Sequence, residues 1–500
     1  MTMKQNLLKT IALGLMAMVG VNAWADNTVT VKVGEASTGY ATLKAAIEAD
    51  AFKNPTGDIE VSISADQSLG DKVISWEPTA NTNYTLTIKA TKDITIKGPN
   101  GSRWFTVKNN GANLVVGDGN YEITLDGEYS GGTTKQRTNP VALRNNTTAN
   151  ITFNKVTFAN FNLNNAVNMI VAENGGGSLT LQDVAINNCV NPKNGYIDNL
   201  RVENDKVLLK GYLNIDEASA GTAFYLALET KSSGTNGRVK IMDDSFTASK
   251  PLSIEYHETS TSYTPKIGAS LVVKDGSLNN FTVEQANMFT LTDSEKGLVK
   301  SNKDLKLTQA YTLAVANVGA ATLVLPFEAT IPANASVYKL AYTEGEPSVN
   351  TTEVSTTLAA NTPVLVMADE GSYKFVSTAT SGETATGSDP VTVGALTGVY
   401  AETIVPSTAY TLNTGSHGVG FYKSNGSKKV KANRAYLSVG SLSAPAYFDI
   451  DFNNGTTGIR IVSSEANTQV NDGIYNLQGV RVENPQKGIY IKNGKKYVVK

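Results

Sequence analysis

Leu86-Thr-Ile88, Ile94-Thr-Ile96 and Phe105-Thr-Val107 open a series of short repeats that continues to Val190. Each repeat places two apolar residues two positions apart, with a small or polar residue between them, often Thr. In a strand this spacing sends both apolar side chains to one face. Strands this short bury too little area alone, so they must stack on copies of themselves. The pattern predicts a right-handed parallel β-helix, whose inward residues include Leu114, Val116, Ile151, Phe153, Leu179 and Leu181.

Corners rich in asparagine and glycine separate the repeats, as in Gly98-Pro-Asn-Gly101 and Asn109-Asn-Gly111. Both residue types tolerate the left-handed backbone conformation, and asparagine side chains also bond to nearby backbone groups. We therefore expect the corner asparagines to form ladders along the solenoid. They are Asn145, Asn146, Asn150, Asn160, Asn162, Asn164 and Asn165.

Composition limits the class of protein. The chain has 500 residues, of which 41% are hydrophobic, 43 are Gly and 21 are Tyr. That mixture favours an all-β protein with more than one core. A net charge of −2 with 18% charged residues argues against nucleic acid as a partner. Cys189 is the single cysteine, so no internal disulfide is expected, and burial is its predicted role.

Residues 1–25 have the three parts of a secretory signal peptide. Lys4 and Lys9 give a basic start, an apolar core follows, and Ala23-Trp-Ala25 is a small-x-small cleavage site. The apolar run is too short to cross a bilayer. The sequence therefore predicts cleavage after Ala25 and a mature chain without a transmembrane span. That chain would be secreted or held on the outer-membrane cell surface.

Ala41–Asp50 is the one stretch with convincing helical spacing, because Leu43, Ala46 and Ile47 fall on one face. A helix here would cap the open core of the first coil. Residues 40–47, together with Ile59-Glu-Val-Ser-Ile63 and the repeats, resemble the pectate-lyase-like superfamily. The resemblance implies a parallel β-helix, which we assign to residues 26–308.

From residue 309 the repeats give way to longer alternating strands. Ala321-Thr-Leu-Val-Leu-Pro-Phe327, Val419-Gly-Phe-Tyr422 and Ala432-Asn-Arg-Ala-Tyr-Leu437 follow in order. That series resembles a β-sandwich module of secreted and surface proteins of Bacteroidota. The resemblance implies a β-sandwich over residues 309–450, a module with no reaction attached to it. Residues 451–471 are polar and are predicted to be a linker.

Residues 472–500 form a basic C-terminal segment, which contains six basic residues and two acidic residues. Glycine turns and Asn493-Gly494 predict a small β-meander. The segment resembles the type A sorting tail of the type IX secretion system, which implies recognition by the export machinery. The matching residues include Gly479, Gly488, Tyr490, Lys495 and Lys496. The alternative is that the meander completes the sandwich, with Tyr490 and Val498 in its core.

Six acidic residues of the solenoid are candidates for catalysis: Asp118, Asp126, Glu128, Asp183, Asp243 and Asp244. Glycoside hydrolysis needs two carboxylates that face each other at about 5–10 Å. The adjacent Asp243 and Asp244 would point to opposite faces of a strand, and no other pair has convincing spacing. Both histidines, His257 and His417, lie outside this set. We assign no catalytic residue.

Four aromatic residues, Trp76, Trp104, Tyr121 and Tyr129, are candidates for a surface on which sugars stack. Core packing is the alternative for them, above all for Trp104 beside Phe105. Residues 117–122 hold oxygen ligands of the kind that calcium prefers, but too few for a site. A solvated turn is favoured there, and no metal or cofactor is assigned.

Two functions remain open. The favoured one is a non-catalytic secreted or cell-surface protein of adhesin type, whose β-helix binds glycan or host and matrix partners. The alternative is a polysaccharide lyase or glycoside hydrolase built on the same β-helix. Carboxylates that share one solenoid face would favour the enzyme.

Overall fold

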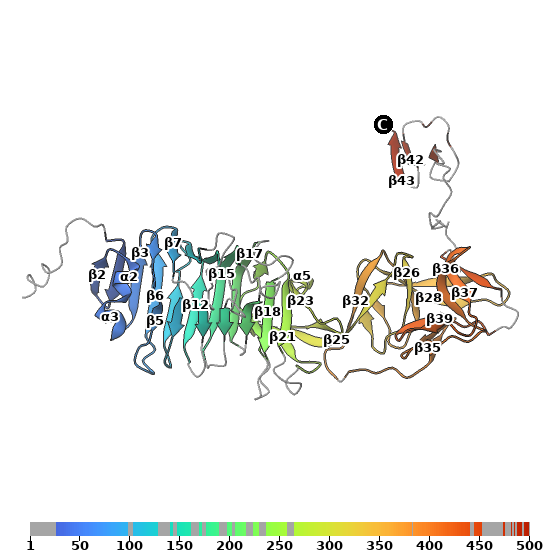
Figure 1. Cartoon of the computed structure of the whole chain (residues 1–500), viewed down its shortest axis with the longest axis horizontal. Helices are drawn as coiled ribbons and strands as arrows, with labels where there is room; N and C mark the ends of the chain where they lie inside the picture. The colour runs from blue at the N-terminus through green and yellow to red at the C-terminus, as the bar shows by residue number, and fades with distance from the viewer. Residues whose placement is uncertain are drawn as a thin grey trace, which may run out of the picture.

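A computed structural model of the chain shows a nearly all-β protein, in which a solenoid is followed by a second β module (Figure 1). The predicted signal peptide and most of the predicted linker lie outside the described residues. Among the described residues, no helix has the length and hydrophobicity that a bilayer crossing requires. The described residues are 27–98, 104–128, 141–143, 148–161, 170–172, 177–189, 198–202, 206–216, 224–229, 237–257, 265–382, 384–440, 445–452, 474–475, 482, 485, 488–492 and 495–499.

Three ladders of parallel strands form the faces of the solenoid. The first ladder consists of β3 (Ile59–Ile63), β6 (Thr85–Ala90), β9 (Asn113–Val116), β12 (Asn150–Asn154), β15 (Leu179–Asn187), β17 (Val207–Ile215), β19 (Val239–Ile241) and β22 (Ser270–Lys274). The second consists of β4 (Gln67–Ser68), β7 (Ile94–Lys97), β10 (Ile123–Asp126), β13 (Val156–Ala159), the later parts of β15 and β17, and β20 (Thr247–Ala248). The third consists of β5 (Ile74–Trp76), β8 (Phe105–Val107), β11 (Val141–Leu143), β14 (Ile170–Ala172), β16 (Asp198–Val202), β18 (Phe224–Glu229), β21 (Leu252–His257) and β23 (Phe289–Leu291). The predicted parallel β-helix is confirmed.

The core runs along the solenoid axis as one continuous cluster. The six residues predicted to point inward are each at most 2% exposed, which confirms the period-two interpretation. Ile59 pairs with Leu86, and Leu86 pairs with Leu114, so successive coils advance by 27 and 28 residues. The ring of Phe153 meets the rings of Phe105 and Phe158 edge-on, at centroid distances of 5.8 and 5.2 Å. Cys189 is also buried, as expected.

At the N-terminal end, β1 (Val29–Val33) pairs antiparallel with β3 and with β2 (Ala36–Tyr40), so the first coil has no open edge at β3. The helix predicted over residues 41–50 is divided into α2 (Leu43–Ile47) and α3 (Asp50–Lys53). The hydroxyl of Thr42 accepts the Ala45 N–H and so caps α2, whose Leu43 and Ala46 are buried.

At the other end, Lys274 takes the inward position that Ile241 occupies one coil earlier. Its side chain is only 1% exposed, and its Nζ donates to Asp244 Oδ1 at 2.5 Å and to Gln285 Oε1 at 3.1 Å. The Nζ also lies 5.6 Å from the ring centroid of Phe281. A buried charge needs such partners. The apolar column therefore ends in an ion pair beside α5 (Val283–Asn287).

Corner ladders hold one coil to the next. Asn160 Nδ2 donates to Asp126 Oδ1 at 2.9 Å, and Asn188 Nδ2 donates to Asn160 Oδ1 at 2.8 Å. Asn160 and Asn188 both have positive φ, the backbone conformation that asparagine tolerates. At another corner, Asn150 Nδ2 donates to Asn113 Oδ1 at 2.8 Å. The ladder prediction is confirmed for Asn150 and Asn160, while Asn145, Asn146, Asn162, Asn164 and Asn165 lie outside the described residues.

β25 (Asp304–Val315) joins the solenoid to the second β module. Its first half pairs antiparallel with β22 and with β24 (Lys296–Ser301), and its second half pairs with β32 (Gly371–Ser377). The boundary predicted between residues 308 and 309 thus falls inside one strand.

The β module has three packed sections of sheet, called here the first, middle and outer layers. The middle and outer layers are parts of one continuous ten-stranded sheet, because β29 (Ser348–Val354) pairs in parallel with β40 (Tyr447–Asp451). The first layer consists of the second half of β25, β27 (Ala329–Thr330), β30 (Thr357–Leu358) and β32. The middle layer consists of β26 (Ala320–Leu323), β28 (Ser336–Tyr342), β29 (Ser348–Val354) and β31 (Val364–Met367). The outer layer consists of β33 (Val391–Val393), β34 (Leu396–Val399), β36 (Tyr410–Gly415), β37 (Gly418–Lys423), β39 (Arg434–Leu437) and β40 (Tyr447–Asp451).

The physical reason for the third layer lies in the middle sheet. Val364 and Val366 belong to the core shared with the first layer, whereas Leu365 belongs to the core shared with the outer layer. A strand that is apolar on both faces must be covered on both faces. A two-stranded antiparallel sheet of β35 (Thr403–Ile404) and β38 (Lys429–Val430) lies beside the outer layer.

In the C-terminal tail, β42 (Gly488–Lys492) pairs antiparallel with β41 (Ile474–Tyr475) and with β43 (Lys495–Val499). Gly488 and Tyr490 thus lie on β42, and Lys495 and Lys496 lie on β43, while Gly479 lies outside the described residues. In the described part of the tail, these three strands form a sheet of their own.

Candidate binding site

Two of the four aromatic residues predicted to bind sugar are core residues. Trp76 and Trp104 are both 0% exposed. Trp76 Nε1 donates to the Tyr84 carbonyl at 3.3 Å, and the ring of Trp104 meets Phe161 edge-on at 5.2 Å. A buried ring has no face open to a ligand, so neither tryptophan can bind sugar. Both follow the alternative interpretation, in which they pack in the core.

Tyr121 is the member of this set that remains at the surface, where it is 42% exposed. Tyr129 lies outside the described residues. The structure therefore brings no two of the predicted aromatic residues together in a described surface site.

The acids considered for catalysis act as hydrogen-bond acceptors within the solenoid. Asp183 Oδ1 accepts the N–H of Tyr212 on the next coil at 2.9 Å, and Asp243 Oδ2 accepts the N–H of Gly211 on the preceding coil at 2.6 Å. A carboxylate that receives a backbone N–H satisfies a donor that would otherwise need water. These acids hold neighbouring coils together.

Other acids of the set are held locally. Asp118 accepts the backbone N–H of Asn120 at 3.0 Å, which is the geometry of a closed Asx turn. The hydrogen bond from Lys274 lowers the pKa of the Asp244 carboxyl below its usual value. Glu128 Oε1 lies 3.6 Å from Nζ of Lys97 on the preceding coil.

Among the described residues, no three His, Cys, Asp or Glu side chains are grouped so as to hold a metal ion.

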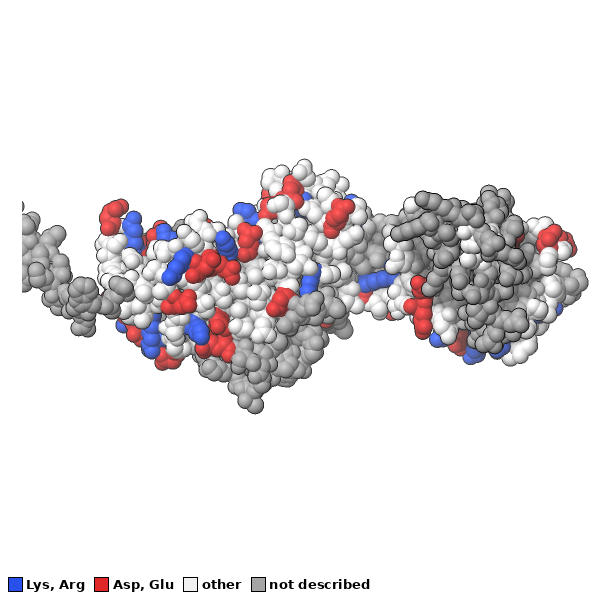
Figure 2. All heavy atoms as spheres, turned by 90° about the horizontal axis from the view of Figure 1, so that it is seen from above, with Lys and Arg blue, Asp and Glu red and all other residues white. Residues whose placement is uncertain are grey.

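Charges on the solenoid surface also pair between coils. Lys89 Nζ lies 2.9 Å from Glu60 Oε1, and Lys240 Nζ lies 2.7 Å from Asp275 Oδ2. Figure 2 shows the consequence, because blue and red side chains are interspersed over the solenoid face in view. That described face presents no large area of one charge.

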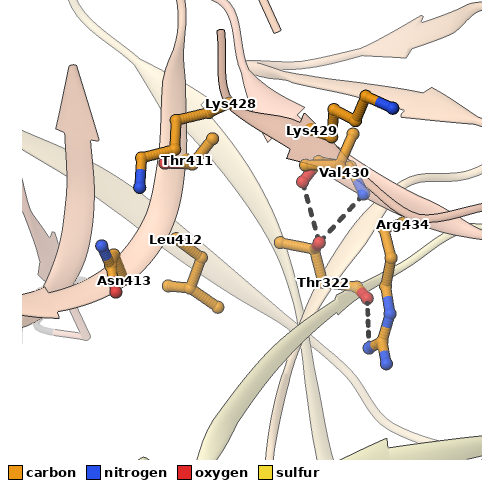
Figure 3. Close-up of a pocket in the computed structure, with 9 residues that line it drawn as sticks. Thr322, Thr411, Leu412, Asn413, Lys428, Lys429, Val430 and Arg434 are labelled. Carbon is orange, nitrogen blue, oxygen red and sulfur yellow. Dashed lines mark hydrogen bonds between the residues drawn. The ribbon is translucent and has the colours of Figure 1, made fainter. Parts of the chain in front are cut away.

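A basic pocket opens in the β module where β36 and β39 separate. The two strands pair at Tyr410 and Leu437 and then diverge. The gap has a volume of about 220 Å³. It is lined by Thr322, Thr411, Leu412, Asn413, Lys428, Lys429, Val430, Arg434 and Ala435 (Figure 3).

Arg434 forms one wall of the pocket. Its Nη1 donates to the Thr322 carbonyl at 3.1 Å, and its Nη2 donates to the Ala314 carbonyl at 3.3 Å. Both acceptors are uncharged. Burial lowers the pKa of the Arg434 guanidinium, which nevertheless stays protonated as arginine does in proteins. These contacts fix the position of the cation without neutralising it.

The two lysines at the rim differ. Lys429 forms an ion pair with Glu402 at 2.7 Å and points away from the pocket in Figure 3. The amino end of Lys428 lies on the side of Thr411 and Asn413 in the same view. Among the described residues, Lys428 has no ion-pair partner. The pocket therefore combines Arg434, whose guanidinium is held in place by two carbonyl groups, with Lys428, whose amino group can move to meet a ligand.

An aromatic cluster lies beside the pocket on the outer sheet. His417 stacks on Tyr447 with ring centroids 4.9 Å apart, and Tyr422 lies against Tyr447 at 4.8 Å. Gly415 and Gly420 make this arrangement possible, because a Cβ at either position would overlap the ring of Tyr422 or Tyr447 respectively. His417 is exposed, and both tyrosines are half-buried.

The pairing of β36 with β37 places this cluster next to the pocket. Thr411, which lines the pocket, pairs with Tyr422, and Asn413 pairs with Gly420. Directly opposed residues of an antiparallel pair have Cβ positions about 5 Å apart. The sequence interpretation missed this site, although Gly415 and Gly420, close to Tyr422 in the sequence, were a signal that aromatic rings lie flat on the backbone here.

Comparisons with known proteins do not extend this description. No protein-family model, no curated protein and no solved structure matched the chain. The candidate site therefore rests on the contacts described above, and the family resemblances stay predictions from the sequence.

Proposed function

We propose that the chain is a non-catalytic secreted or cell-surface protein of adhesin type. The observation that carries this proposal is that acidic residues of the solenoid accept hydrogen bonds within the fold. Asp183 and Asp243 accept backbone N–H groups from neighbouring coils, so they stabilise the solenoid instead of facing a substrate. The solenoid serves as a rigid support, because each coil is bonded to the next along its faces and corners.

Binding is assigned to the β module rather than to the β-helix. The sequence interpretation placed the ligand on the solenoid, but Trp76 and Trp104 are core residues there. The basic pocket and the aromatic cluster lie together on the outer sheet of the β module. A surface protein of this kind holds its binding sheet at a distance from the start of the solenoid.

A panel of acidic and neutral polysaccharides tests the proposal. The intact chain is expected to bind at least one of them without release of reducing ends or unsaturated products. Turnover that disappears when one solenoid acid is changed in a folded variant would contradict it, and would favour the lyase or hydrolase alternative.

Export through the C-terminal tail is a separate part of the proposal. Support comes from the basic character of residues 472–500 and from the sheet that β41, β42 and β43 form with one another. Deletion of residues 472–500 should leave the melting temperature unchanged and retain the chain in the periplasm of a host with the machinery. A truncated chain that still reaches the surface contradicts the sorting role. A lowered melting temperature instead supports packing of the tail against the β module.

A further inference from the structure

The pocket of the β module lies in a segment whose charge is not balanced. Residues 423–434 contain five basic residues, Lys423, Lys428, Lys429, Lys431 and Arg434, and no acidic residue. Within the described residues, the ion pair recorded for this segment is that of Lys429 with Glu402. The solenoid lysines Lys89 and Lys240, in contrast, have acids on neighbouring coils. An external anion would supply the missing countercharge.

The size of the pocket and the donors that line it suit a small anionic group. Its volume of about 220 Å³ is below the 300–1,000 Å³ or so of pockets that enclose a whole small molecule. The donors that face it are of two kinds, the amino group of Lys428 and the side-chain amide of Asn413 (Figure 3). Arg434 adds a fixed positive charge at the wall, held by two carbonyl oxygens. A carboxylate or a sulfate fits this donor set.

The aromatic cluster indicates what carries that anionic group. The ring of Tyr422 reaches along the strand toward the hairpin turn, because its hydroxyl donates to the Gly418 carbonyl at 2.8 Å. It therefore runs beside the pair formed by Asn413 and Gly420. Exposed His417 extends the cluster. Aromatic side chains offer an apolar face together with a polar edge, which suits the flat apolar face of a sugar ring.

We propose that the pocket at Lys428, Asn413 and Arg434 binds the carboxylate or sulfate of an acidic saccharide, while a sugar ring lies on the Tyr422–Tyr447–His417 cluster. This inference rests on the proposed function and names its ligand class and site. Nucleic acid is disfavoured as the ligand, because the basic segment is short and the chain as a whole carries a net charge of −2.

The test is calorimetric titration of the intact chain with three oligosaccharides of matched length: one with uronate groups, one with sulfate groups and one neutral. The two acidic probes distinguish carboxylate from sulfate as the preferred group. Lys428→Ala should weaken binding of the preferred probe about tenfold, the usual effect of losing one charge-assisted hydrogen bond. Binding should also weaken as salt is added, because the attraction is screened.

Lys431→Ala is the matched control, since Lys431 is an exposed lysine of the same basic segment that does not line the pocket. It should change affinity less than twofold. Tyr447→Ala should weaken binding of the acidic probes, while a sugar-free anion such as sulfate keeps its affinity for the pocket.

Three outcomes would overturn the inference. They are equal affinity for the neutral and acidic probes, equal effects of the two lysine substitutions, and tighter binding of an oligonucleotide than of either acidic saccharide. Under the first two outcomes the chain still binds glycan, and the proposed function stands. Turnover of the probes would instead contradict the proposed function itself.

Discussion

The solenoid and the β module use charged side chains in opposite ways. In the solenoid, Asp183 and Asp243 accept backbone N–H groups, and Lys274 is buried against Asp244. In the β module, Arg434 donates to two carbonyl groups, and Lys428 lines the pocket with its amino end on the side of Thr411 and Asn413. Polar residues of the solenoid therefore stabilise the fold, whereas those of the pocket are available to a ligand.

The largest effect is expected from the solenoid core. Phe153 is 0% exposed, and Phe153→Ala should cost about 3–5 kcal/mol of unfolding free energy, as buried aromatic truncations do. Tryptophan fluorescence can follow this transition, because Trp76 and Trp104 both lie in the solenoid core and Trp24 precedes the predicted cleavage site. Thr152→Ala is the control, because its side chain points outward, and it should stay within about 0.5 kcal/mol. Equal effects of the two substitutions would mean that the strand register is wrong.

A smaller loss is expected at a solenoid corner. Asp243→Ala removes the acceptor of the Gly211 N–H and should cost about 1–2 kcal/mol, the range of a charge-assisted bond in a half-buried setting. Asp243→Asn keeps an acceptor oxygen and should cost less. Neither substitution should alter saccharide binding, which is measured in parallel. An Asp243→Ala variant with unchanged stability would show that the corner acids are not structural.

Acidification should affect the solenoid more than the β module. Hydrogen bonds from lysines lower the pKa of Asp244 and of Asp275, whose ordinary value is 3.8. Because the pKa is lower in the folded state, the ionised form stabilises the fold above pH 4, and that contribution is lost as pH falls below the ordinary value. In thermal melts between pH 7 and pH 2.5, the solenoid, followed by its tryptophan signal, should lose stability at a higher pH than the β module does.

Asp244→Asn serves as the control for the acid effect. It should lower stability at pH 7 and flatten the dependence on pH, since the amide does not titrate. A solenoid and a β module that lose stability in parallel would contradict this part of the comparison.

The smallest effect is expected at the pocket. Lys428 is exposed and has no ion-pair partner among the described residues, so Lys428→Ala should change unfolding free energy by less than about 0.5 kcal/mol. Arg434→Met should cost more, because Arg434 donates to Thr322 and Ala314. Denaturant titration of both variants measures the difference. A large loss in Lys428→Ala would assign this lysine to the fold and remove it from the candidate site.

The solenoid core could be predicted from the sequence because its signal is local. Leu114 and Val116, or Ile151 and Phe153, lie two residues apart, and that spacing alone assigns them to one face. The same signal applied to Ile74-Ser-Trp76 would have placed Trp76 in the core. Register therefore decides the position of this ring, whereas residue type alone would also allow a surface site.

The pocket could not be predicted from the sequence, because its walls are distant along the chain. Thr322 and Arg434 are joined by a hydrogen bond across 112 positions, and the gap depends on where β36 and β39 diverge. The strands that cover the second face of the middle layer could not be predicted for a similar reason. The apolar run Val364–Met367 predicts a strand covered on both faces, but not which sheets cover it.

Hydrogen–deuterium exchange of the intact chain, with and without an acidic oligosaccharide, tests whether the β module or the solenoid binds the ligand. We expect protection in peptides that cover residues 411–423 and 428–435, with little change in solenoid peptides that cover residues 59–257. Protection confined to the solenoid, with the pocket peptides unchanged, would contradict this expectation.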